Sequence, residues 1–95
     1  MTEREEKILD ACRHIGDTVY SVTFNVPNEE PRLLKSVIHH VHVAAFPPIL
    51  LVDEWGSIIG SIEEIGRWNG DYFSSFSSSE VEEKIEEWWK EKLGL

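Results

Sequence analysis

Cysteine, long apolar runs and basic side chains are all scarce in this chain, and each shortage excludes a class of protein. Cys12 is the single cysteine among 95 residues, so neither an intrachain disulfide nor a Cys-x-x-Cys pair can form. The longest stretch without a charged or polar side chain is 43–52, ten residues that include two prolines, which excludes a membrane-spanning helix.

The shortage of Lys and Arg leaves the chain strongly acidic. Eighteen acidic and nine basic side chains give a formal net charge of −9. This charge opposes phosphate binding, so we expect no nucleic-acid partner. It suits high solubility, a basic protein partner, or an acidic decoy that occupies the nucleic-acid-binding surface of another protein. The acidic start at 1–6 is unlike a signal or transit peptide, and no membrane partner is expected, which favours the cytoplasm.

The composition is that of an ordinary globular protein, and the length predicts one domain over 1–95. Thr2-x-x-Glu5 is a capping box that begins a helix over roughly 3–15. Alternating apolar and polar residues over 18–26 predict a strand. Asn28 as a cap and a proline in the first turn predict a second helix over roughly 29–42.

The stretch 46–59 is the centre of the predicted fold. Its apolar run 49–52 predicts a buried strand between a proline pair and the turn 53–56, and 57–62 predicts the returning strand. A last helix begins near Ser79 and ends at Gly94. The result is a small single-domain α/β sandwich of order α-β-α-β-β-α, with a three-stranded mixed sheet that includes the strand at 18–26.

The pattern of proline, strand, Asp-x-x-Gly and strand over 48–59 resembles the C-terminal part of a thioredoxin-like domain of the TlpA-like type. The resemblance covers roughly 18–95 and implies a cis peptide bond before Pro48. The chain departs from the family at 2–6, where the redox cysteines would stand, and Pro47 has no N–H to offer an extended substrate. The family's strand before the first helix is also missing. The sheet is then shortened or completed by another strand, or the resemblance is only partial.

The side chains that could carry chemistry predict neither a catalytic site nor a cofactor or metal site. His39, His40 and His42 lie on the predicted second helix, where a zinc site at His39 and His42 would need a third ligand from His14 or an acidic side chain. No Cys/His pattern supports that site, so we expect a polar helix face, with a pH response as the functional alternative. Cys12 falls on the apolar stripe of the first helix, which predicts a buried and unreactive thiol.

Four aromatic side chains occupy a segment rich in Gly and Ser, namely Trp68, Tyr72, Phe73 and Phe76. They either cover an open sheet edge or the end of the core, or form a surface for a partner. We predict a non-catalytic protein-binding or regulatory domain of thioredoxin-like type, without redox activity. It would be a homodimer or bind another protein, through these aromatics or a sheet edge. The alternatives are a thiol enzyme that uses Cys12 and the acidic decoy.

Overall fold

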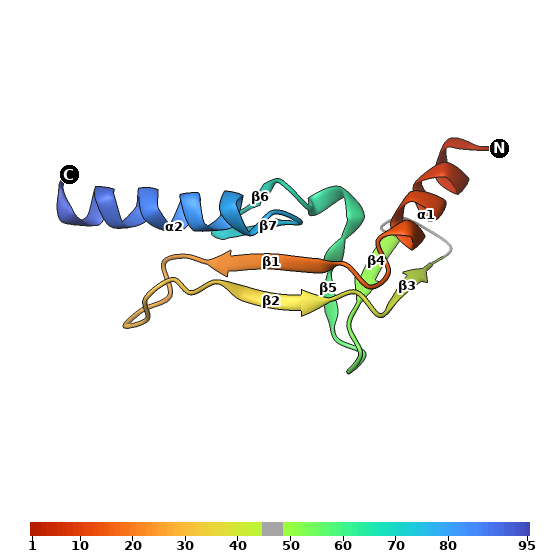
Figure 1. Cartoon of the computed structure of the whole chain (residues 1–95), viewed down its shortest axis with the longest axis horizontal. Coiled ribbons are helices and arrows are strands. Elements are labelled where there is room, and N and C mark those ends of the chain that lie inside the picture. Colours follow the sequence, from red (N-terminus) through yellow and green to blue (C-terminus); the bar gives the residue numbers. More distant parts are fainter. Residues whose placement is uncertain (45–48) are drawn as a thin grey trace.

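The computed structural model describes residues 1–44 and 49–95, which form a small α/β fold with two α-helices and two antiparallel sheets (Figure 1). The four-stranded sheet has the order β2-β1-β7-β6, and the three-stranded sheet has the order β3-β4-β5. The elements in chain order are α1 (Glu3–Arg13), β1 (Thr18–Thr23), β2 (Leu34–Val37), β3 (His40–Val43), β4 (Ile49–Val52), β5 (Ile58–Ser61), the 3-10 turn η1 (Ile62–Glu64), β6 (Trp68–Asn69), β7 (Tyr72–Ser75) and α2 (Ser78–Leu93).

Two clusters of buried side chains hold these elements together. Under α2, the four-stranded sheet buries a cluster made of Val22, Phe24, Phe73 and Val81. Between α1 and the three-stranded sheet lies the second cluster, made of Ala11, Val19, Ile38, Ile49 and Leu51. Val19 of β1 and Ile38, the residue after β2, belong to it, so the second cluster joins the two sheets. The molecule is elongated, with extents of 51 × 26 × 21 Å.

Both ends of the chain fold as predicted. Thr2 accepts a hydrogen bond from the Glu5 N–H and completes the capping box at the start of α1. Gly94 ends α2 with φ 74°, a left-handed conformation that glycine adopts without a steric penalty. The cap of α2 is Ser77 rather than Ser79. Among the described residues, neither α-helix is both long and apolar enough to cross a bilayer.

The predicted helix over 29–42 is wrong, because this segment forms β2 and β3. Asn28 has φ 63° and belongs to a left-handed turn rather than to a helix cap. Leu34, Val37, Ile38 and Val41 fit a helical stripe, but the segment is also rich in β-branched residues, which favour strands. Pairing with β1 and β4 decides between the two, since each pairing supplies a full antiparallel ladder.

Residues 34–43 form one extended segment that is the outer strand of both sheets. β2 pairs with β1 and β3 pairs with β4. Between them the Ile38 N–H donates to the Asp17 carbonyl at 3.0 Å, and the His39 N–H donates to the Val52 carbonyl at 2.8 Å. The segment thus passes from one sheet to the other without losing its backbone partners.

The central hairpin is confirmed, but its predicted sheet is not. β4 and β5 pair antiparallel with a register shift between Leu51 and Val52. The strand predicted at 18–26 is β1, which ends at Thr23 and belongs to the other sheet, so the expected three-stranded mixed sheet is wrong. The cis bond expected at Pro48 lies outside the described residues.

Candidate protein-binding edge

A groove runs beside the free edge of β2. It has a volume of about 450 Å³ and lies between β2 and the turn that joins β4 to β5. Its lining residues are Ile15, Gly16, Lys35, Ser36, Val37, Ile38, His39, Glu54 and Trp55. β2 borders open space in Figure 1, and the β4–β5 turn projects below it at the right.

The register of the four-stranded sheet shows which backbone groups of β2 are free. The Ile38 N–H points to the β1 side, and residues two and four positions earlier in an antiparallel strand point the same way. Ser36 and Leu34 therefore direct their N–H and C=O groups to β1. Lys35 and Val37 direct theirs outward, into the side of the groove. This outward side of Leu34–Val37 is called the β2 edge below.

Trp55 stands at the opposite wall of the groove on a well-braced turn. One carboxylate oxygen of Asp53 accepts hydrogen bonds from the Trp55 N–H at 3.0 Å and the Ser57 N–H at 2.9 Å. The Asp53 N–H donates to the Ser57 carbonyl, and Gly56 takes φ 81°. The Trp55 side chain is nevertheless 81% exposed. Because Trp is enriched among the residues that dominate binding at protein interfaces, Trp55 is a candidate contact residue.

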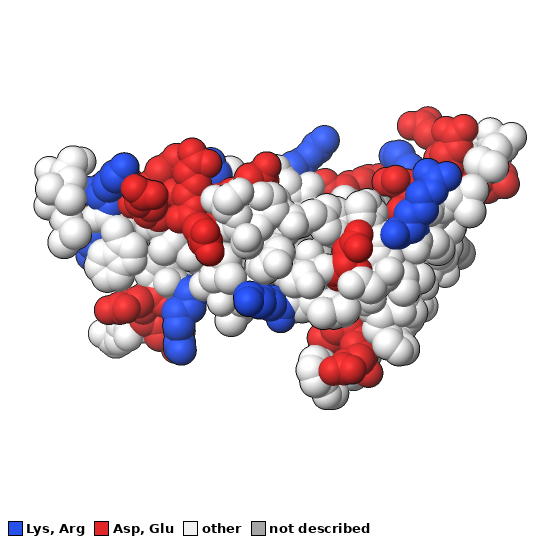
Figure 2. Space-filling view, in the orientation of Figure 1, with Lys and Arg blue, Asp and Glu red and all other residues white. Residues whose placement is uncertain are grey.

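The β2 edge lies in the longest stretch of this acidic chain that has no carboxylates. Residues 31–52 contain no Asp or Glu but do contain Arg32, Lys35 and three histidines. In the view of Figure 2, acidic side chains gather over α2, around the start of α1, on the β4–β5 turn and at the connection between β1 and β2 at the lower left. The β2 edge therefore presents Lys35 and no carboxylate of its own, with Glu54 on the facing wall.

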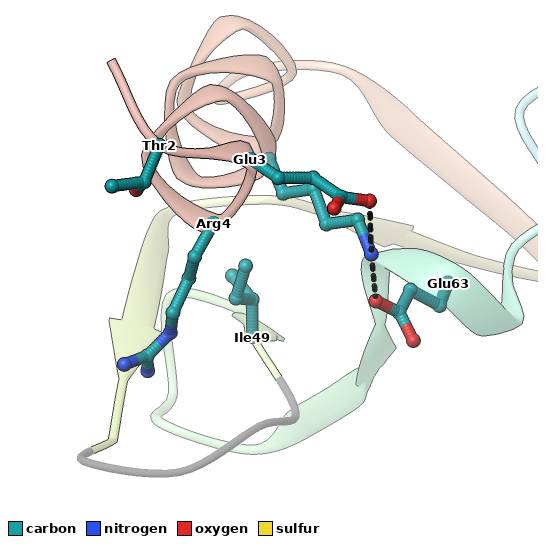
Figure 3. Close-up of a pocket in the computed structure, with 6 residues that line it drawn as sticks. Thr2, Glu3, Arg4, Ile49 and Glu63 are labelled. Atoms are coloured by element: carbon teal, nitrogen blue, oxygen red, sulfur yellow. Dashed lines mark hydrogen bonds and ion pairs between the residues drawn. The ribbon is translucent and has the colours of Figure 1, made fainter.

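A second cavity, of about 380 Å³, lies between the start of α1, Ile49 and η1 (Figure 3). The Lys7 ammonium sits between Glu63 at 3.1 Å and Glu3 at 4.0 Å, and these pairs are the dashed lines in Figure 3. The hydrogen bond and charge of Glu63 raise the pKa of Lys7 above its ordinary value. The Arg4 guanidinium donates to the Ala44 carbonyl. The cations of this cavity thus bind the protein itself and fasten α1 to its neighbours.

Three of the four aromatics predicted as a partner surface pack on the two buried clusters. Phe73 is buried, and Trp68 packs on Phe73 and Phe24 with ring centroids 5.2 and 5.5 Å away. Phe76 packs on the other cluster and stacks on His14 at 4.2 Å. Tyr72 is half-buried on β7. Their arrangement fits the first of the two predicted roles, which is to cover a sheet edge and the ends of the core.

Cys12 is exposed, so the prediction of a buried thiol is wrong. The buried face of α1 runs through Ile8 and Ala11, and a helical residue adjacent to Ala11 points about 100° away from it. Leu9 is exposed for the same reason. Within residues 1–44 and 49–95, no hydrogen bond or ion pair links the Cys12 thiol to a base. The neighbouring His14 is paired with Asp17 at 2.9 Å.

The histidines lie on strands instead of a helix. His39 joins β2 to β3, and its Nδ1 lies 3.3 Å from Nδ1 of His40. His40 and His42 are alternate residues of β3 and share one face of it. Over the described residues, no three His, Cys, Asp or Glu side chains come together as metal ligands.

Sequence reasoning missed Trp55, Val37 and Ile15 as surface residues. Trp55 carried a usable signal, because a tryptophan in the Asp-x-x-Gly turn of a tight hairpin has no core to face. Val37 carried none while its segment was assigned to a helix.

Comparisons with family models, with curated proteins and with solved structures found no match to this chain.

Proposed function

We propose that the chain is a non-catalytic protein-binding domain that binds an extended protein segment along the β2 edge. The observation that carries this proposal is the combination, in one groove, of outward backbone groups at Lys35 and Val37 with the exposed Trp55. Main-chain hydrogen bonds to a free edge supply affinity, and side-chain pockets beside the edge supply specificity. Trp55 provides the large rigid contact that dominates many protein interfaces.

The thioredoxin-like type remains part of this proposal. The β4–β5 hairpin with its Asp53-x-x-Gly56 turn supports it. The strands at 34–43 stand where the second helix of that family would be, which leaves the hairpin and α2 as the elements that support the likeness.

A library of displayed peptides tests the proposal. Peptides selected on the folded wild-type chain should bind Trp55→Ala about tenfold or more weakly, because removal of a central aromatic costs that much at an interface. Ile58→Ala is the matched control, since Ile58 is also a large exposed side chain on the β4–β5 hairpin but does not line the groove. Selected peptides that bind all three proteins equally would contradict the proposal.

A thiol enzyme is the second candidate, and the exposure of Cys12 is the observation that favours it. A nucleophilic thiol needs a lowered pKa, from a nearby cation or a helix N-terminus. The iodoacetamide rate of the folded protein tests this candidate. A rate well above that of a free thiol would support it, and a rate equal to a free thiol would mark an ordinary surface cysteine.

A further inference from the structure

We infer that the segment bound at the β2 edge is β2 of a second copy of this chain. This inference rests on the proposed function, because it assigns the occupant of the same groove. The two β2 strands pair antiparallel across a two-fold axis, so that two four-stranded sheets become one continuous sheet. Two-fold dimers are the commonest symmetric assembly of soluble proteins.

The register follows from the backbone directions of β2. A two-fold axis at Ser36 places Lys35 opposite Val37 of the partner subunit, and Val37 opposite Lys35 of the partner subunit. Both residues direct their N–H and C=O groups outward, so each pair exchanges two hydrogen bonds. This register brings no two like charges directly opposite each other, which would be destabilising.

Charge selects a second copy over a foreign segment. A strongly basic partner would meet Lys35 at the edge, whereas a strongly acidic one would meet Glu54 on the facing wall. A copy of the same groove offers both signs at once, which suits a self-complementary two-fold contact. Two chains of charge −9 repel each other, and the β2 edge adds no carboxylate of its own to the contact.

Exposed apolar side chains on and beside the β2 edge would add to the contact. Leu34 is 56% exposed and Val37 is 53% exposed, although both are large apolar residues of a strand. Trp55 and Ile15 add further exposed apolar area on the other side of the groove. A specific dimer should bury about 1,000 Å² or more in total, and both grooves contribute to that area.

Sedimentation equilibrium at tens of micromolar tests the inference with two matched variants. The wild-type chain should have twice the 11.0 kDa mass of one chain. Val37→Lys should raise the dimer dissociation constant at least about tenfold, because it places a second ammonium directly opposite Lys35 of the partner subunit in both pairs. Val43→Lys makes the same change at an exposed valine of β3 and should leave the dimer intact. A wild-type monomer would overturn the inference, and so would a dimer that Val37→Lys does not weaken.

A cross-link tests the register independently of any effect on folding. In a Cys12→Ser background, Ser36→Cys faces its own copy across the axis in a non-hydrogen-bonded pair, whose Cα atoms lie about 4.5 Å apart. That distance allows a disulfide, so mild oxidation should give covalent dimers. Leu34→Cys in the same background should give few. Equal cross-linking of the two would overturn the register.

These outcomes separate the inference from the proposed function. A monomeric wild-type chain whose selected peptides still depend on Trp55 would overturn the dimer and leave the peptide-binding edge in place. A dimer that does not depend on Val37, together with peptides that do not depend on Trp55, would overturn both.

Discussion

At one edge of the four-stranded sheet, β6 is two residues long and its Trp68 ring packs on Phe24 and Phe73. At the other edge, β2 is four residues long, and Leu34 and Val37 lie in solvent beside an open groove. The same chain thus covers one edge with its own aromatics and leaves the other free. Natural sheets usually shorten, charge or cover their edges, because a free edge pairs with other chains.

This difference assigns separate roles to aromatic residues that look alike in the sequence. Trp68 is 52% exposed, but its ring completes the cluster under α2. Trp55 is exposed on a braced turn and has no intramolecular ring partner among the described residues. We therefore expect changes at the β6 edge to alter stability, and changes at the β2 edge to alter association.

Phe73→Ala should have the largest effect on stability, because it removes a buried ring that packs with Val22 and Val81. We expect a loss of about 3–5 kcal/mol in the free energy of unfolding, measured by urea denaturation. A loss below about 1 kcal/mol would show that the β6 side of the sheet does not depend on this cluster.

Trp68→Ala should lower stability by about 1–3 kcal/mol, because two aromatic contacts are lost and part of the ring stays in water. The mass of the dimer in solution should not change. Loss of the dimer in a variant that remains folded would move the contact surface from β2 to the aromatic segment.

Trp55→Ala should change the free energy of unfolding by no more than about 0.5 kcal/mol, because the side chain packs on little of its own chain. The same variant should weaken the dimer about tenfold, as measured by the concentration dependence of its mass. A large loss of stability without a change in association would reverse the roles assigned to the two tryptophans.

Lys7→Met should have the smallest effect, and only on the pH dependence of stability. Glu63 raises the pKa of Lys7 above 10.5, so the ammonium stabilises the fold fully below that pH and less as the pH rises through the folded-state pKa. The wild-type chain should lose slightly more stability than Lys7→Met between pH 9 and 12. Because Lys7 lies away from the β2 edge, the dimer at neutral pH should be equally strong in both. Identical alkaline titrations would contradict the raised pKa.

Local signals in the sequence predict the parts of the fold that local interactions determine. The Thr2 capping box, the hairpin at 49–61 and the glycine end of α2 were all predicted, because each depends on residues a few positions apart. The strands at 34–43 were not, since their apolar spacing also fits a helix and the decision comes from pairing with β1 and β4.

The candidate site was harder to predict than the fold because it depends on which strand is left at an edge. The sequence shows Trp55 in a hairpin turn, but its relation to Val37 exists only once residues 34–37 pair with β1. The exposure of Cys12 has a similar cause. The apolar stripe of the first helix, namely Ile8, Leu9, Cys12 and Ile15, is wider than the contact that α1 makes, and Ala11 rather than Cys12 takes the centre of that contact.

Amide hydrogen exchange at β2, followed as protein concentration rises, tests most directly whether the open edge is the contact surface. The Ser36 N–H points to β1 and should be protected at every concentration, which makes it an internal control. The Lys35 and Val37 N–H groups point outward, so they should exchange rapidly in dilute protein and become protected as dimers form. Rapid exchange at Lys35 and Val37 at concentrations where the protein is dimeric would contradict pairing at this edge.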